Sequence, residues 1–264
     1  MEIIDFHVHP FRRKENCLNF YPEMDDLDAS GMQNQLTQAG ISHICGSVLT
    51  KQPMEPGFEA LRRLNREALA LRESLGDFYT PGFHIHPAFC RESCEEIDFM
   101  HRRGIRLMGE LVPYMHGWGE FDGQSWMEIM DLADEYGMLC CYHTPFAFDM
   151  GPMLSAHPNV TFVAAHPGDR ERVEEHIRLM KQHDNLYLDL SGTGLFRLGV
   201  LRHLVTQVGA ERILFGTDSP WMDQKDTLEL FLSLPLSPEA RERILWKNAM
   251  ELYDLQSWLD GEAE

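Results

Sequence analysis

Short apolar runs alternate with longer segments of helical periodicity along the whole chain. The apolar runs are IIDFHVH, SHICGSVL, FYTPGFHIH, IRLMGEL, MLCCYHT, VTFVAAH, LYLDLSG and ILFGTDS. Between them lie amphipathic segments such as FEALRRLNREALALRESLG, in which leucine or alanine recurs at helical spacing. Such strand–helix units predict a parallel sheet whose strands are joined by right-handed helical crossovers.

Eight such units in 264 residues match the strand count and the length of a (β/α)8 TIM barrel. An open, doubly wound sheet is the alternative, but no GxGxxG motif follows the first apolar run. Because no linker, low-complexity run or sequence repeat divides the chain, we expect a single domain over residues 1–264. The segment SPEARERILWKNAMELYDL predicts a closing C-terminal helix.

Composition narrows the class of partner. Hydrophobic residues make up 44% and charged residues 25% of the chain, which is ordinary for a globular protein with a large core. The formal net charge of -19 argues against a nucleic acid or an anionic membrane, because phosphate binding needs clustered lysine and arginine. We therefore expect a small-molecule substrate. Aromatic side chains at Trp246 and Trp258, if exposed, would also favour a homodimer.

Several features predict a cytoplasmic protein. The chain does not open on a basic segment followed by an apolar one, and no apolar stretch approaches the roughly 18 residues that a membrane span needs. The six cysteines form no CxxC pair, so we interpret them as buried, reduced thiols. Neighbouring Cys140 and Cys141 would face opposite sides of a strand.

The carboxyl ends of the predicted strands carry the residues that could perform chemistry, and the active site of a (β/α)8 barrel lies at these ends. Two histidines end the first run one residue apart, so both imidazoles share one face of the strand. Imidazoles and carboxylates that converge on one rim are what a divalent transition metal needs. In chain order the polar strand ends are His7, His9, His84, His86, Glu110, His143, His166, Ser191 and Asp218.

These residues carry a resemblance to a known family. HVH on the first strand, His143 in CYHTP, His166 in AAHPG and Asp218 in GTDSPW resemble the metal-site signature of the amidohydrolase superfamily. The terminal KNAMELYDL is similar to the closing helix of that family. The chain looks closest to the amidohydrolase-related branch, which includes lactonases, other metal hydrolases and metal-dependent decarboxylases of aromatic acids.

The resemblance implies that one ion binds to His7, His9 and Asp218, with His143 as a further ligand. Zinc is the expected ion, and manganese is the alternative. Water bound to such an ion has a pKa near 7 instead of about 15.7, so hydroxide is available at neutral pH. Asp218 would take the proton from that water and later deliver it to the leaving group. His166 would bind a second ion or donate a hydrogen bond to the substrate.

Glu110 in LMGEL departs from the aromatic decarboxylases of the branch, which usually have no metal-binding acid there. Dinuclear members of the superfamily use a fourth-strand group to bridge two ions. In that arrangement Glu110 would join the first ion to a second one held by His143 and His166. In the mononuclear alternative Glu110 makes only a hydrogen bond, and a pairing with a surface arginine is also open.

Four functions fit these features. The leading one is a metal-dependent hydrolase of a small ester, lactone or amide, and the second is a decarboxylase of a small aromatic or unsaturated acid. A third resemblance is to the TatD-like deoxyribonucleases, which would make the protein a phosphodiesterase, but the net charge of -19 counts against it. A non-catalytic binding barrel is the fourth, and it predicts metal binding without turnover.

Candidate substrate-binding residues lie after the predicted strands. Arg12 and Arg170 could clamp an anionic group, although surface charges that balance nearby acids are the alternative. The segment PYMHGWGEFDG at 113–123 predicts a lid or pocket wall, because it combines hinge-forming glycines with aromatic side chains. The further candidates are His86, which repeats the HxH spacing in FHIHP, and His116, Trp118 and Trp221.

Alternation along the strands gives one more prediction. If His7 and His9 point into the barrel, Asp5 does so too, and Arg106 lies on the same face as Glu110. A buried arginine needs carboxylate partners. We therefore expect Arg106 inside the barrel, paired with Asp5, Asp189 or another acid.

Overall fold

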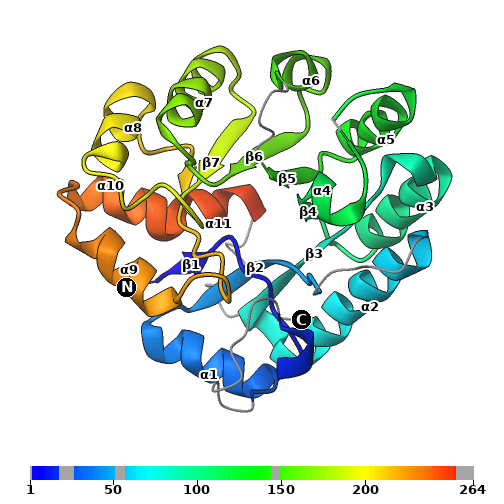
Figure 1. Cartoon of the computed structure of the whole chain (residues 1–264), viewed down its shortest axis with the longest axis horizontal. Coiled ribbons are helices and arrows are strands. Elements are labelled where there is room, and N and C mark those ends of the chain that lie inside the picture. Colours follow the sequence, from blue (N-terminus) through cyan, green and yellow to red (C-terminus); the bar gives the residue numbers. More distant parts are fainter. Residues whose placement is uncertain (1, 18–26, 51–56, 120, 144–148, 254–264) are drawn as a thin grey trace.

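The computed structural model of the protein describes residues 2–17, 27–50, 57–119, 121–143 and 149–253. Eight parallel strands follow one another in chain order around a barrel (Figure 1). They are β1 (Ile4–Asp5), β2 (His43–Ser47), β3 (Tyr79–Phe83), β4 (Leu107–Leu111), β5 (Leu139–His143), β6 (Thr161–Ala165), β7 (Leu186–Asp189) and β8 (Ile213–Leu214). The predicted (β/α)8 barrel and its single domain are confirmed.

Backbone hydrogen bonds beyond the last strand close the barrel. Phe6 N donates to Phe215 O at 2.9 Å, and His9 N donates to Ser219 O at 2.8 Å. A parallel bridge between Val8 and Ser219 lies in the same seam. The first and last strands are therefore joined beyond their short regular parts, at the end where the candidate ligands lie.

Helices form a ring around the strands (Figure 1). The principal ones pack their apolar faces on the barrel; in α2, for example, Leu61, Leu64, Ala68 and Leu71 are buried at the predicted spacing. The helices are α1 (Ala29–Ala39), α2 (Phe58–Leu75), α3 (Cys90–His101), α4 (Pro113–His116), α5 (Gln124–Glu135), α6 (Gly151–Ala156), α7 (Arg170–Gln182), α8 (Val200–Val208), α9 (Gln224–Ser233), α10 (Pro238–Glu242) and α11 (Asn248–Tyr253). No described helix is long and apolar enough to cross a membrane.

The strands divide the core into two parts. Alternate side chains point into the barrel or out towards the helices, and the two cysteines of β5 show this: Cys140 belongs to the outer cluster and Cys141 to the inner one. The inner cluster contains Ile4, Leu107, Leu139, Val163 and Leu214. All six cysteines are free thiols.

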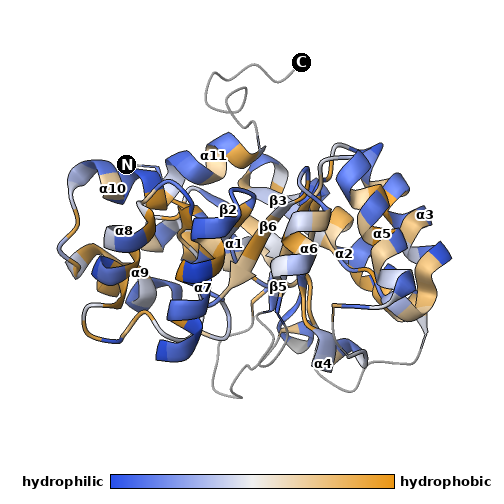
Figure 2. Ribbon diagram, turned by 90° about the horizontal axis from the view of Figure 1, so that it is seen from above, coloured by the Kyte–Doolittle hydropathy of each residue, from blue (hydrophilic) through white to orange (hydrophobic). Residues whose placement is uncertain are grey.

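The predicted closing helix is present in three parts. α10 is followed by five residues of π-helix, Arg243–Lys247, and then by α11. Ala249 and Met250 of α11 pack on the inner cluster, so this helix closes the amino-terminal end of the barrel. α11 and α4 lie at opposite edges in the view of Figure 2.

The prediction for Arg106 is wrong. Its guanidinium donates to Gly137 O at 2.7 and 3.2 Å, in the turn before β5, and pairs with neither expected acid. The pairing of β4 with β5 shifts register between Met108 and Leu111. Side chains therefore do not alternate strictly between inside and outside along β4. For this reason, the inward direction of Glu110 cannot be used to predict the direction of Arg106.

Candidate metal centre

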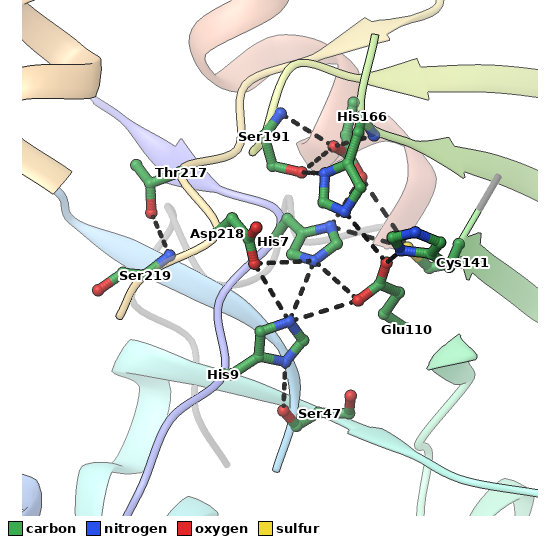
Figure 3. Close-up of polar contacts among 12 residues, drawn as sticks. His7, His9, Ser47, Glu110, Cys141, His166, Ser191, Thr217, Asp218 and Ser219 are labelled. Carbon is green, nitrogen blue, oxygen red and sulfur yellow. Dashed lines mark hydrogen bonds and ion pairs between the residues drawn. The ribbon is translucent and has the colours of Figure 1, made fainter. Parts of the chain in front are cut away.

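Six side chains expected at strand ends come together at the mouth of the barrel (Figure 3). Two of them have a left-handed backbone, His166 with φ 69° and Asp218 with φ 67°. Such a conformation costs about 1–3 kcal/mol in a non-glycine residue and clusters at functional sites. The six are His7 and His9 beyond β1, Glu110 in β4, His143 at the end of β5, His166 beyond β6 and Asp218 beyond β8.

Three of these side chains, His7, His9 and Glu110, present donor atoms to a common point, and Asp218 lies beside them. His7 Nε2 and His9 Nε2 lie 3.3 Å apart, and each lies 3.4 Å from Glu110 Oε2. Asp218 Oδ1 lies 3.4 Å from His9 Nε2 and 3.8 Å from His7 Nε2. Ligands around a tetrahedral zinc ion, each at about 2.0–2.1 Å, are about 3.3–3.4 Å from one another. The spacing therefore fits a small cation placed among these atoms.

The outer hydrogen bonds of the two histidines define their tautomers. His7 Nδ1 lies 2.9 Å from Asp189 Oδ2, and His9 Nδ1 lies 3.0 Å from Ser47 O. Because a carboxylate and a carbonyl only accept, both Nδ1 atoms donate, and in the neutral rings both Nε2 atoms carry lone pairs. Buried lone pairs that face one another and two carboxylates need positive charge between them. Outer partners of this kind are usual for metal-binding histidines.

The second oxygen of Glu110 faces another pair of histidines. Glu110 Oε1 lies 2.8 Å from His143 Nδ1 and 3.3 Å from His166 Nε2. On its other side His166 Nδ1 lies 3.0 Å from Ser191 Oγ, and this hydroxyl donates to Asp189. His166 therefore donates through Nδ1 and turns Nε2 towards Glu110. Glu110 connects two potential ligand groups through its two oxygens.

Electrostatics at the centre favour a cation. Burial alone would raise the pKa of Glu110, but His7 and then His143 and His166 hold it well below its usual range. Burial also opposes protonation of His9, yet its bonds to Asp218 and Glu110 outweigh this and raise its pKa to about 9. The cluster therefore requires positive charge, from protons or from a divalent ion. This donor set fits a divalent metal.

Asp189 is the supporting residue that sequence analysis did not assign to the site. It is fully buried, accepts from His7 Nδ1, and also accepts from Ser191 through its other oxygen. The available signal was an acid inside the apolar run LYLDLSG. Cys141 lies beside the same carboxylate, and burial raises the pKa of its thiol to about 12.

The candidate substrate residues take different positions. Arg12 and Arg170 are exposed after β1 and at the start of α7, and Trp221 is half-exposed beyond β8. His86 uses both ring nitrogens within the protein: Nδ1 accepts from Ala88 N at 3.0 Å, and Nε2 donates to His116 O at 3.1 Å. A hydrogen bond from His86 to substrate would therefore require one of these bonds to break. The anionic clamp stays a prediction.

The expected lid contacts the centre at one edge. Tyr114 of α4 lies edge-on to His143, with ring centroids 5.4 Å apart. Trp118 is anchored by stacking on Trp126 of α5 at 5.4 Å. Residue 120 lies outside the described residues. The segment borders the site, and its movement as a lid stays a prediction.

Comparison with known proteins identifies the family. The model of the amidohydrolase family matches residues 4–255. The chain therefore belongs to the amidohydrolase family, whose members include metal-dependent enzymes. Gamma-resorcylate decarboxylase from Polaromonas sp. (strain JS666 / ATCC BAA-500) is 36% identical over 73 residues, which span 28% of this chain and 22% of that relative.

Solved structures share the fold over nearly the whole chain. An uncharacterized TIM-barrel protein from Bordetella bronchiseptica has a TM-score of 0.74 at 22% identity and covers 96% of this chain and 99% of its own. A dihydroxybenzoic acid decarboxylase from Polaromonas sp. JS666, with bound manganese and 2-nitroresorcinol, has a TM-score of 0.72 at 15% identity. The match covers 96% of this chain and 97% of that enzyme. A Pseudomonas putida protein, proposed to be a 2-pyrone-4,6-dicarboxylic acid hydrolase, has a TM-score of 0.69 at 20% identity. The match covers 96% of this chain and 98% of that protein.

Proposed function

We propose that the protein is a metal-dependent decarboxylase of a small aromatic acid. The related gamma-resorcylate decarboxylase acts on such an acid by its name, and decarboxylases recur among the solved structures of similar length. Hydrolysis, which the sequence features favour first, becomes the second candidate. The support comes from the relatives together with the shape of the site.

The observation that carries the proposal is where the exposed hydrophobic side chains lie relative to the polar centre. The large hydrophobic side chains that are exposed in the described part of the chain all follow β4, β7 or β8, on the side of the barrel where the ligand groups lie. Small-molecule sites combine hydrophobic and aromatic side chains with a few polar groups. A substrate with an anionic end and an apolar ring matches both parts. The side chains are Tyr114, Phe196, Leu198, Trp221 and Met222.

The residues of the site would have different roles in decarboxylation. A divalent ion held by His7, His9, Glu110 and Asp218 would neutralise the substrate carboxylate and polarise its oxygens. Asp218, whose side chain is 13% exposed at the edge of the cluster, takes up a proton from solvent and delivers it to the ring carbon that carries the carboxylate. The bond between that carbon and the carboxylate then breaks, its electron pair returns to the ring, and carbon dioxide leaves. His166 is held by Ser191 through Nδ1, and its Nε2 lies 3.3 Å from Glu110 Oε1, beside the place where the substrate would bind.

Product analysis tests this proposal. Metal-free protein is reloaded with zinc or manganese and incubated with 2,6-dihydroxybenzoate and other hydroxybenzoates, and carbon dioxide and the phenol are quantified. We expect equal amounts of both products, dependence on metal, and loss of turnover in Asp218→Asn. Absence of carbon dioxide from the whole panel would contradict the decarboxylase.

Hydrolysis of a ring ester is the second candidate because Glu110 faces two histidine pairs with its two oxygens. His7 and His9 on one side of Glu110, and His143 and His166 on the other, would each help to hold an ion, and such ions would supply an activated water and polarise a carbonyl oxygen. The same preparations are therefore tested with lactones such as 2-pyrone-4,6-dicarboxylate and with a phosphodiester. Ring opening without decarboxylation would support this candidate, and phosphodiester cleavage would support the TatD-like alternative.

A further inference from the structure

A second group of buried histidines lies beside the metal centre, where β3 ends. Helices α2 and α3 hold the backbone there through side chains. Asn65 accepts from His84 N at 2.7 Å and donates to His84 O at 3.0 Å. Ser93 accepts from His86 N and donates to His86 O, both at 2.9 Å. The positions of both histidines are therefore held by buried polar contacts on either side.

His84 and the candidate ligand His9 bond to neighbouring residues at the end of β2. His9 Nδ1 lies 3.0 Å from Ser47 O, and His84 Nε2 lies 2.8 Å from Val48 O, the next carbonyl along the chain. Because a carbonyl only accepts, His84 Nε2 must donate. In a neutral imidazole ring one nitrogen donates and the other accepts. The Nδ1 atom of His84 is therefore a hydrogen-bond acceptor.

This acceptor has no partner among the residues that the structure describes. The His84 side chain is 1% exposed, and its Nδ1 atom is buried. A buried polar atom without a hydrogen bond costs about 1–3 kcal/mol, so such atoms are rare and call for an explanation. A ligand that brings an O–H or N–H to His84 would satisfy this atom.

His116 supplies the complementary group. Its ring lies edge-on to that of His84, with centroids 4.7 Å apart, and both its nitrogens are buried without a partner in the described part of the chain. Burial, and then the neighbouring His84 and His86, hold the pKa of His116 well below its usual value. The neutral ring has one donor and one acceptor. Side by side, the two rings offer both kinds of group.

We propose that His84 and His116 form the specificity subsite for a hydroxyl group on the substrate. The hydroxyl donates to His84 Nδ1, and its oxygen accepts from the N–H of His116. A hydroxyl satisfies both rings at once, whereas a methoxy group lacks the donor and a bare ring lacks both. This inference rests on the proposed function for the aromatic acid, and it adds the requirement for a ring hydroxyl.

Ligand binding tests the subsite independently of turnover. Dissociation constants are measured by calorimetry at pH 7 for benzoate, its three hydroxy isomers and the matching methoxy compounds, on the metal-loaded protein. We expect one hydroxy isomer to bind about tenfold more tightly than benzoate and than its own methyl ether, the effect of one buried hydrogen bond. The isomer that shows this preference reports where the hydroxyl sits relative to the carboxylate.

Two variants attribute that preference to the histidines. His84→Gln can retain the donor to Val48 O while losing the Nδ1 acceptor, and His116→Phe keeps a ring in place without its nitrogens. Both should bind the preferred isomer no more than about twofold more tightly than benzoate, with metal content unchanged. His43→Gln is the matched control: His43 is equally buried but bonds Asp77 O and Thr80 Oγ1 at the start of β2. It should retain the preference.

The outcomes separate this inference from the proposed function. An unchanged preference in both folded variants, or no preference in the wild type, would overturn the subsite. If His84→Gln does not fold, His116→Phe alone decides. A preference that both variants lose in a protein that releases no carbon dioxide would support the subsite while contradicting the decarboxylase.

Discussion

The two ends of the barrel are buried to the same degree but are built from opposite chemistry. At the amino-terminal end, Ile4, Leu107 and Leu139 fill the interior beneath α11. At the carboxyl end, side chains as buried as these are ionisable, with His7 2% exposed and Asp189 0% exposed. Apolar burial stabilises a fold, whereas burial of charge costs several kcal/mol per ion unless the charge is compensated.

This difference indicates that stability and chemistry are separated along the barrel axis. Burial of apolar side chains at the amino-terminal end can offset the free-energy cost of burying ionisable groups at the mouth. Substitutions at the two ends should therefore fail in different ways: loss of folding at one end, and loss of metal or turnover at the other.

The largest effect is expected from Asp218→Asn. The change keeps the size of the side chain but removes the proton carrier and one potential ligand. Turnover of the best substrate should fall by about 10²–10⁴-fold, the usual contribution of a general acid or base. Circular dichroism and thermal unfolding of the metal-free protein should match the wild type. A folded variant with wild-type turnover would remove Asp218 from the mechanism.

Leu139→Ala should lower the stability of the fold without changing the chemistry of the site. Leu139 is completely buried in the inner cluster, and its truncation leaves a cavity. The free energy of unfolding should fall by about 2–5 kcal/mol in denaturant titration. Metal affinity and turnover per folded molecule should not change. A large loss of metal affinity in the folded variant would show that the two ends are coupled.

The free energy of unfolding of the metal-free protein should depend on pH through the ionisable groups at the mouth. The pKa of His9 rises from 6.5 to about 9 in the folded state, so its stabilising protonation is complete below pH 6.5 and is lost as the pH rises through 9. The free energy of unfolding should fall over this range by up to about 3 kcal/mol. Metal-loaded protein should show a smaller fall, because the ion replaces the protons. Equal pH profiles with and without metal would contradict this.

Asp189→Asn should have the smallest effect. It weakens the partner of His7 Nδ1 without removing a ligand. Metal affinity, measured by competition with a chelator, should fall by about 10–100-fold. Glu175→Gln on the surface of α7 is the control and should bind metal as the wild type does. An unchanged affinity in Asp189→Asn would mean that Asp189 only fills space.

Most of the fold could be predicted from the sequence because each strand lies in a short apolar run and amphipathic segments of helical periodicity separate these runs. Sequence analysis also located the six potential ligands, since parallel strands bring their carboxyl ends to one rim. Alternation failed for Arg106 because the register shift in β4 is not visible in LMGEL.

The partners of the ligands were harder to predict. His84 follows β3 and His116 ends α4, so their proximity depends on how these two segments pack together. Periodicity within a strand cannot give such a contact. The expected homodimer also stays a prediction: Trp246 is half-buried against the core, and residue 258 lies outside the described residues.

Metal content of wild type and Glu110→Gln tests the central claim, that Glu110 helps to hold a divalent ion at the mouth of the barrel. Glu96→Gln is the control, because Glu96 is equally buried but bonds Asn65 and Arg66 between α2 and α3. After reloading with zinc and gel filtration, we predict near one equivalent in the wild type and in the control, and far less in Glu110→Gln. Two equivalents in the wild type that fall to one in Glu110→Gln would favour the hydrolase, and equal metal content in all three folded proteins would contradict Glu110 as a ligand.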